Sequence, residues 1–236
     1  MTQPDLLKQS RMIKPLIATL GIALTLIGSP AFSSEQAMSP YPLHDAARQD
    51  NVQVVQQLLS SGSELDARDP SGSTALLVAA RANSVGAAKA LIEAGADVNA
   101  KDQIQDSAYL YSGARGHLDI LKMTLAHGAD LKSTNRYGGT ALIPAAERGH
   151  VDTVETLIEA GVAVDHVNNL GWTALLEAIL LGDGGERHQK IVELLLQAGA
   201  DPDLADRDGI TPIQHARKRG FDQIEKSLLS TQARRP

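Results

Sequence analysis

The sequence predicts an all-α solenoid of about six stacked helix-turn-helix units with hairpin-like turns. A short Thr-Ala-Leu-type motif recurs at intervals of about 33 residues, as solenoid repeats do, and apolar residues follow each copy at helical spacing. A repeat of this length is typical of proteins in which each unit buries its apolar stripe against its neighbours. Only 3% of the 236 residues are aromatic, whereas Ala and Leu are abundant, which favours close packing of helices over a β-sandwich.

Two motifs mark each unit, and the Thr-Ala-Leu-type motif is the first of them. The second motif is a Leu-rich segment that ends in Ala-Gly or Gly-Ala-Asp, and its copies occupy residues 91–97, 125–130, 157–161 and 195–201. The first motif starts at Thr74, Ser107, Thr140 and Thr173. Related segments start at Tyr41, one period earlier, and at Thr211, slightly more than one period later.

One unit shows how the residues specify the helices. Thr140 is a good N-cap for a first helix, and Ala145 and Ala146 give that helix a small face. Gly149 then provides a left-handed stop, and His150 opens the second helix, whose apolar residues at 151, 154, 157 and 158 form one stripe. Because one helix pair cannot bury this stripe alone, the units must stack.

These motifs resemble the T-P-L-H and G-A-D signatures of the ankyrin repeat. The resemblance covers about residues 40–230 and implies an ankyrin-repeat domain over that range. A linker over 34–39 precedes the domain, and a tail over 231–236 follows it. The predicted repeats are about 40–68, 69–101, 102–134, 135–167, 168–205 and 206–230.

The segment 1–33 has the features of a cleaved secretory signal peptide. Three basic residues precede an apolar run over 16–27, which is shorter than the roughly 20 residues that a membrane span needs. Small residues permit cleavage after Ala31 or after Ser33. We therefore expect a periplasmic or secreted protein without stable membrane insertion after cleavage, and an uncleaved N-terminal anchor is the alternative.

The charge and the missing cysteines exclude several classes of protein. The chain has 22 Lys and Arg residues, 28 Asp and Glu residues and a net charge of −6. Cleavage would remove three of the basic residues and one of the acidic residues, which leaves −8. This charge disfavours a nucleic-acid partner, because affinity for nucleic acid comes mainly from a positive surface. With no Cys, a disulfide scaffold and a Cys-ligated metal site are excluded.

No pattern of catalytic or cofactor-binding residues stands out. His117, His150 and His188 fall at the same place in their repeats, which indicates capping and bonding between repeats rather than metal ligation. We therefore predict a monomeric, non-enzymatic protein without cofactor or metal. An enzyme would need a convergent polar cluster in a cleft.

Four departures from the repeat mark individual features. Gln105 replaces the usual turn glycine, which predicts a turn of different shape. Pro144 lacks the amide that would bond Thr140, at modest cost so near a helix start. Glu177 falls in a row that is normally apolar in ankyrin repeats, and it is either solvated or partly buried with a partner.

The fourth departure is an insertion at 183–187, predicted to be a loop between the two helices of the fifth repeat. It is either a tolerated extension, or a segment from which Asp183, Arg187 or His188 reaches Glu177 or the binding face.

In the ankyrin family, ligands usually contact the hairpin tips and the ends of the first helices on the concave side. Mapped by register, Tyr137 and Trp172 lie on adjacent tips and are the predicted anchors, since binding energy concentrates in Trp, Tyr and Arg. Alternatively, Trp172 packs into the core. The arginines of this surface would pair with acidic groups on the partner. The predicted partner-binding residues are Ile104, Arg115, Arg136, Tyr137, Arg148, Leu170 and Trp172.

The sequence therefore predicts an exported protein–protein interaction module that binds another protein through its central repeats. The alternative is a small-molecule-binding ankyrin protein that uses the 183–187 insertion together with Glu177 and Trp172.

Overall fold

The computed structural model describes residues 39–234, and within this range it contains twelve α-helices and no strand. This confirms the predicted all-α fold of six helix pairs, whereas the signal peptide predicted over 1–33 lies outside the described residues. The first helices of the pairs are α1 (Pro42–Arg48), α3 (Ala75–Ala82), α5 (Ala108–Arg115), α7 (Leu142–Glu147), α9 (Ala174–Leu180) and α11 (Pro212–Arg219). The second helices are α2 (Val52–Ser60), α4 (Val85–Glu93), α6 (Leu118–Ala126), α8 (Val151–Glu159), α10 (Glu186–Gln197) and α12 (Asp222–Gln232).

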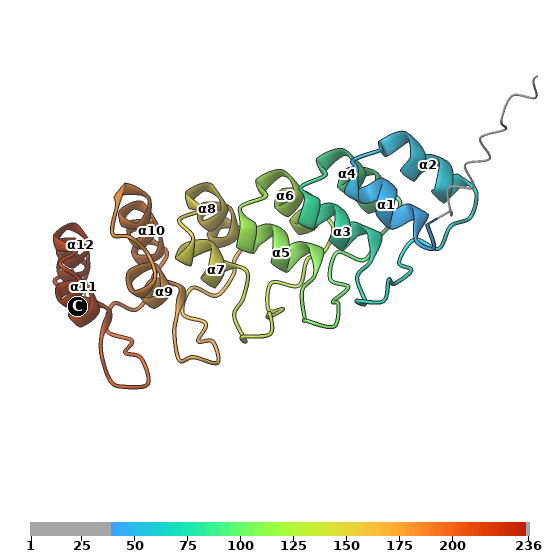
Figure 1. Ribbon diagram of the computed structural model, residues 1–236. Coiled ribbons are helices and arrows are strands. Elements are labelled where there is room, and N and C mark those ends of the chain that lie inside the picture. The colour runs from blue at the N-terminus through green and yellow to red at the C-terminus, as the bar shows by residue number, and fades with distance from the viewer. Residues whose placement is uncertain (1–38, 235–236) are drawn as a thin grey trace, which may run out of the picture. The chain divides into compact units, whose positions relative to one another are not determined.

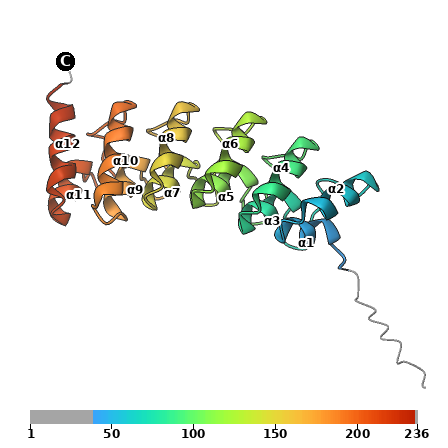
Figure 2. The ribbon, with the colours of Figure 1, turned by 90° about the horizontal axis from the view of Figure 1, so that it is seen from above.

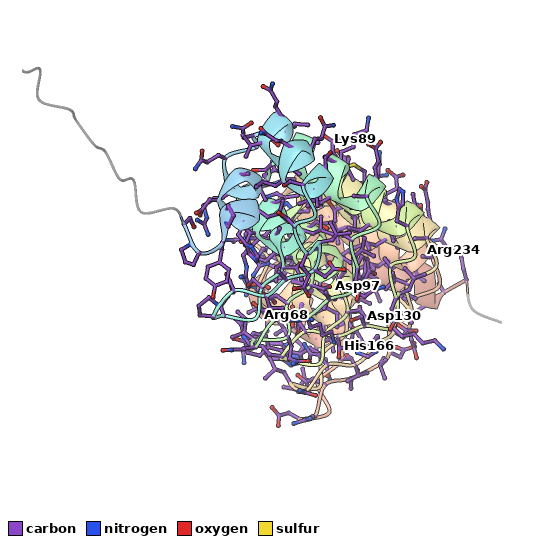
Figure 3. All side chains as sticks on the ribbon, turned by 90° about the vertical axis from the view of Figure 1, so that its right-hand side faces the viewer. Arg68, Lys89, Asp97, Asp130, His166 and Arg234 are labelled. Atoms are coloured by element: carbon purple, nitrogen blue, oxygen red, sulfur yellow. The ribbon has the colours of Figure 1, made fainter. Side chains whose placement is uncertain are left out.

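The helices of this domain form two rows (Figures 1 and 2). Each first helix packs against the first helices of the neighbouring pairs, and each second helix packs against the neighbouring second helices. Long loops extend from the row of first helices (Figure 1). In the view of Figure 3, Lys89 of α4 lies on the helical side, and Arg68 and His166 lie on the side of the loops. Among the helices of residues 39–234, none combines the length and the apolar character that a membrane span requires.

The core follows the predicted pattern of small and large apolar residues. Ala145 and Ala146 of α7 are fully buried, which lets neighbouring first helices approach closely. Val154 and Leu157 of α8 are also fully buried, and the rest of the α8 stripe packs against the same core from its edge. Each helix pair therefore buries its stripe against the next pair, as stacking requires.

Each of five hairpin tips is built around one Asp or Asn side chain. The Oδ1 atom of that residue accepts hydrogen bonds from the backbone N–H groups two and four residues further on, at 2.8 to 3.1 Å. Such local bonds are the reason that Asp and Asn favour turns. The residues are Asp69, Asp102, Asn135, Asn168 and Asp206, which share one register in the repeat.

The turn at Gln105 has the same form as the others, contrary to the prediction. Gln105 adopts a φ of 65°, in the left-handed region, where Gly138 has a φ of 72° in the next repeat. Its N–H donates to the carbonyl of Asp102 at 3.1 Å, as the N–H of Gly138 does to Asn135 at 2.9 Å. The hydrogen bonds of Asp102 thus hold a non-glycine residue in a conformation that such residues rarely adopt.

The start of α7 also differs from the prediction, because Thr140 is not its N-cap. The N-cap is Ala141, and Oγ1 of Thr140 is buried without a hydrogen-bond partner in the described part of the chain. Pro144 has no N–H to offer the Thr140 carbonyl, and the N–H of Ile143 bonds that carbonyl instead, at 3.3 Å. In α3, the corresponding N–H, that of Leu77, donates to Oγ1 of the N-cap Thr74 at 3.2 Å. Pro144 therefore diverts the capping N–H, and α7 has only six residues.

Two of the three histidines at the repeat period bond to the preceding repeat. Nδ1 of His117 lies 2.9 Å from the carbonyl oxygen of Ala80, and Nε2 of His188 lies 2.9 Å from that of Glu147. Both carbonyls belong to the first helix of the preceding repeat, so the predicted bonding between repeats is confirmed for these two residues. His117 and His150 are the N-cap residues of α6 and α8, as predicted, but their side chains make no capping hydrogen bond. His188 is not at an N-cap, because α10 begins after Gly185.

Replacing Gln105 by glycine should stabilise the protein by up to about 1 kcal/mol. A left-handed conformation costs an L-residue roughly 1–2 kcal/mol, and the greater freedom of glycine in the unfolded chain offsets part of this gain. Gly209→Gln is the matched reverse change, because Gly209 has a φ of 75° and a Cβ there would meet no atom within 4 Å. Urea unfolding followed by circular dichroism should shift in opposite directions for the two variants. An unchanged midpoint for Gln105→Gly would contradict this account of the turn.

Candidate functional site

A groove lies between the hairpin tips and the first helices of the central repeats. It is formed by α5, α7 and α9 together with the tips around Tyr137 and Leu170, and its volume is about 400 Å³. Tyr111, Pro144 and Glu177 occupy one register in successive first helices, and all three line the groove. These three residues belong to the row that is normally apolar in ankyrin repeats, and the structure places them together in one groove.

Five of the seven predicted partner-binding residues line this groove. Tyr137 and Leu170 are 53% and 49% exposed, so two large side chains on adjacent tips are open to a partner. Ile104, which is 48% exposed, and the half-buried Trp172 lie outside the lining, and their contact with a partner stays a prediction. The five lining residues are Arg115, Arg136, Tyr137, Arg148 and Leu170.

Three arginines of the groove are held by uncharged groups. The guanidinium of Arg136 lies 4.8 Å from the ring centroid of Tyr137, and Nε of Arg115 donates to the hydroxyl of Tyr111 at 3.2 Å. Nη1 of Arg148 donates to the Ala114 carbonyl at 2.6 Å. Among residues 39–234, no carboxylate lies within ion-pair distance of these three guanidinium groups. Their positive charge is therefore available to a partner.

Glu177 is a buried acid on one side of the groove. It is only 6% exposed, and its Oε1 accepts a hydrogen bond from Nδ2 of Asn168 at 2.7 Å. Burial, and then the nearby Glu147, raise the pKa of Glu177 to about 7, although the Asn168 bond and Arg148 act in the opposite direction. Of the two predicted environments, the structure shows burial with a partner, and that partner is an amide.

The bond between Asn168 and Glu177 belongs to a pattern that recurs along the chain. In the last repeat, the tip residue Asp206 pairs in the same way with His215 of α11, at 2.7 Å. In the repeat formed by α7 and α8, the tip residue is Asn135 and the corresponding helix residue is Pro144, whose side chain has no hydrogen-bonding atom. Nδ2 of Asn135 consequently has no hydrogen-bond partner among the described residues.

Asn135 lines the groove, and sequence reasoning missed it. The sequence did contain a sign of its role, because Asn135 and Pro144 are nine residues apart, as are the bonded pairs Asn168–Glu177 and Asp206–His215. Recognising it requires knowing that the tip residue and the helix residue bond to each other, which the repeat period alone does not reveal.

The 183–187 insertion folds back on itself rather than toward Glu177. Oδ1 of Asp183 lies 2.7 Å from Nδ1 of His188 and accepts the N–H of Gly185 at 2.9 Å. Glu186 and Arg187 are the first residues of α10, so the observed loop is shorter than the predicted loop over 183–187. Neither the insertion nor Trp172 lines the groove beside Glu177, so this groove does not bring together the elements of the predicted small-molecule site. Within residues 39–234, no three His, Asp or Glu side chains are grouped to hold a metal ion.

Glu177 should make the stability of the protein depend on pH. Its pKa of about 7 exceeds the ordinary value of 4.5, so folding takes up a proton between these two values. The folded state is therefore penalised progressively as the pH rises from about 4.5 to about 7, and the penalty stays at higher pH. Glu177→Gln can accept the same bond from Asn168 without the charge, and it should be more stable than the wild type at pH 8 by up to about 3 kcal/mol.

Urea unfolding at pH 4, 6 and 8 measures this difference, which should be smallest at pH 4. Glu155→Gln, on the exposed face of α8, is a matched control for the loss of one acidic group. A gap between wild type and Glu177→Gln that stays the same at all three pH values would show that burial of this carboxyl does not govern its protonation.

Comparisons with known proteins agree with the fold. The family described as ankyrin repeats (3 copies) matches residues 16–102 and 109–206. The crystal structure of an ankyrin repeat domain from Acinetobacter baumannii AYE is 70% identical, with a TM-score of 0.80 over 81% of this chain and 98% of that one. The ankyrin repeat protein EF0377 is 43% identical, with a TM-score of 0.77 over 80% of this chain and 96% of that one.

A shorter match is to YahD, a putative ankyrin repeat protein of Escherichia coli strain K12. It is 51% identical over 57 residues, which are 24% of this chain and 28% of the length of YahD. Ankyrin repeats are generally protein–protein interaction modules, and proteins built from them are typically non-enzymatic binding scaffolds. The family match over most of the chain, together with the two solved structures, shows that this chain belongs to the ankyrin-repeat family.

Proposed function

We propose that this chain is an exported, non-enzymatic binding protein that contacts a partner protein through the groove and the neighbouring hairpin tips. The observation that carries the proposal is the convergence of five predicted residues in one groove, where exposed apolar side chains lie beside three arginines. Protein interfaces draw most of their binding energy from a few such residues.

The tips that carry the two exposed side chains are joined to each other. The N–H of Asn169 donates to the carbonyl of Tyr137 at 2.9 Å, and Arg136 stacks on the Tyr137 ring. An anchor that is already held in place loses little conformational freedom when a partner binds. Tyr137 is therefore the central anchor of the proposed interface, and Ile104 and Trp172 on the neighbouring tips would extend it.

The arginines of the groove support a partner with an acidic surface. The chain as a whole has a net charge of −6, and Arg115, Arg136 and Arg148 line the groove without an ion-pair partner among the described residues, beside Asp106, Glu147 and the buried Glu177. Complementary charge of this kind favours one orientation of approach and raises the rate of association.

Tyr137→Ala should weaken partner binding at least tenfold, because it removes the central anchor of the interface. The partner would be captured from a cell-envelope extract and identified by mass spectrometry, and the affinity of the purified pair would be measured by calorimetry. Leu229→Ala is the matched control, since Leu229 of α12 is a large exposed apolar residue outside the groove, at 42% exposure. Trp172→Ala and Ile104→Ala measured in parallel give the extent of the surface. Loss of binding in these two variants but not in Tyr137→Ala would place the interface elsewhere.

Export through the signal peptide predicts a mature chain that starts at Phe32 or Ser34. Fractionation of cells that express the full chain, followed by N-terminal sequencing, tests this prediction. The expected product is a shortened chain in the periplasm or the medium. A full-length chain in the cytosol would refute export, and a full-length chain in the inner membrane would indicate the uncleaved anchor.

A further inference from the structure

In three of the five tips, the second polar atom of the tip side chain bonds to a first-helix side chain of its own repeat or of the preceding one. Oδ2 of Asp102 pairs with Arg81 at 2.5 Å, and Oδ2 of Asp206 pairs with His215 at 2.7 Å. Asn168 replaces a carboxylate by an amide, and it donates from Nδ2 to an acid. The second polar atom of the tip side chain is thus an acceptor where it faces Arg81 or His215, and a donor where it faces Glu177. Asn135 presents the same N–H donor but meets no acceptor in the described chain.

The space over Asn135 is kept open by Gly139. Four residues after each tip residue, the other repeats carry Ser73, Asp106, Trp172 and Ile210. Gly139 has no left-handed φ, so its backbone does not require glycine. A Cβ at this position would meet the Asn135 amide and the Cβ of Ile143 at 3.6 Å, which is ordinary contact. Asn135 and Gly139 both line the groove, and Gly139 puts no side chain between the Asn135 amide and the groove.

The groove has more hydrogen-bond donors than free acceptors. Three guanidinium groups and the Asn135 amide are donors, whereas Asp106 already lies 3.4 Å from Nη2 of Arg81. Glu177 is bonded to Asn168, and its pKa of about 7 means that much of it is neutral at neutral pH. Glu147 is thus the acid of the lining that is neither paired with an arginine nor bonded to a tip side chain. A group that brings only acceptors and negative charge complements this arrangement, because hydrogen bonds between guanidinium and carboxylate are among the stronger ones in proteins.

We propose that the groove binds an Asp or Glu side chain of the partner protein, with Nδ2 of Asn135 and the guanidinium groups of Arg115, Arg136 and Arg148 as its donors. This inference rests on the proposed function and adds the chemical class that the groove selects. Tyr137 and Leu170 contact the apolar part of the same partner segment, and the carboxylate sets its position along the groove.

Selection of peptides from a random display library on the immobilised full chain reads this chemistry directly. The probes are the selected peptides, which should be several-fold richer in Asp and Glu than the unselected library. Their affinity should fall at least tenfold for Asn135→Asp, which replaces the donor by a negative charge. The fold tolerates this change, because Asp occupies the same position at Asp102 and Asp206 with the same turn bonds. Gln223→Glu is the matched control, since it makes the same change of amide to carboxylate on the exposed face of α12.

Filling the groove gives a second, independent test. Gly139→Ile introduces the side chain that Ile210 has at this position of the last repeat, and it should abolish binding of the selected peptides. Thermal unfolding shows whether each variant folds. If the isoleucine variant does not fold, Gly139→Ser is the smaller replacement, because it introduces the side chain that Ser73 has at this position.

The outcomes separate this inference from the proposed function. Peptides that lose binding to Tyr137→Ala but are not enriched in acids, or that bind Asn135→Asp as well as the wild type, would overturn the carboxylate and leave a protein-binding groove. Enrichment in Lys and Arg would overturn it in the same way. If no selected peptide depends on Tyr137 or Gly139, the groove is not a protein-binding site and both proposals fail.

Discussion

Each helix pair of this chain can bury its apolar stripe only against the next pair, and the rest of the structure depends on this constraint. Stacking places residues of the same register side by side, so every turn, cap and contact between repeats is made several times. The Asx turns at the five tips and the bonds of His117 and His188 to the preceding first helix are examples. A substitution in one repeat therefore acts at a fixed place in the stack, next to the unchanged versions on either side.

The groove results from several such substitutions falling close together. At the position where the next repeat has the acceptor Glu177, this repeat has Pro144, whose side chain accepts no hydrogen bond. The Nδ2 donor of Asn135 is therefore left without a partner in the described chain. Gly139 places no side chain beside this donor, and Glu177 adds a buried acid in the next repeat. None of these residues forms a site alone. Their positions in the register bring them together on the face formed by the first helices and the tips.

The sequence was sufficient to predict the helix pairs, because the period and the small and large apolar positions both follow directly from packing. It also predicted that Arg115, Tyr137 and Arg148 lie on one surface, since residues at known positions of a regular stack need only the register to be placed. Local competition between hydrogen bonds was harder to predict. Gln105 keeps the left-handed turn because the Asp102 bonds outweigh its backbone preference.

Thr140 does not cap α7 for a related reason. Pro144, four residues later, has no N–H for the Thr140 carbonyl, so the N–H of Ile143 bonds this carbonyl instead of the Thr140 hydroxyl. The donor of Asn135 could not be recognised without the structure. Its role depends on which helix residue each tip side chain meets, and no single residue type reveals that pairing.

Three features of the central repeats reduce stability. The hydroxyl groups of Tyr109 in α5 and Thr140 before α7 are buried without partners in the described chain, and each such group costs roughly 1–3 kcal/mol. Glu177 adds the cost of a buried carboxyl at neutral pH. Residues that break local rules without a gain in stability tend to occur where function requires them. Of these three residues, Glu177 lines the groove, so the cost of its burial falls on the face that we propose binds the partner.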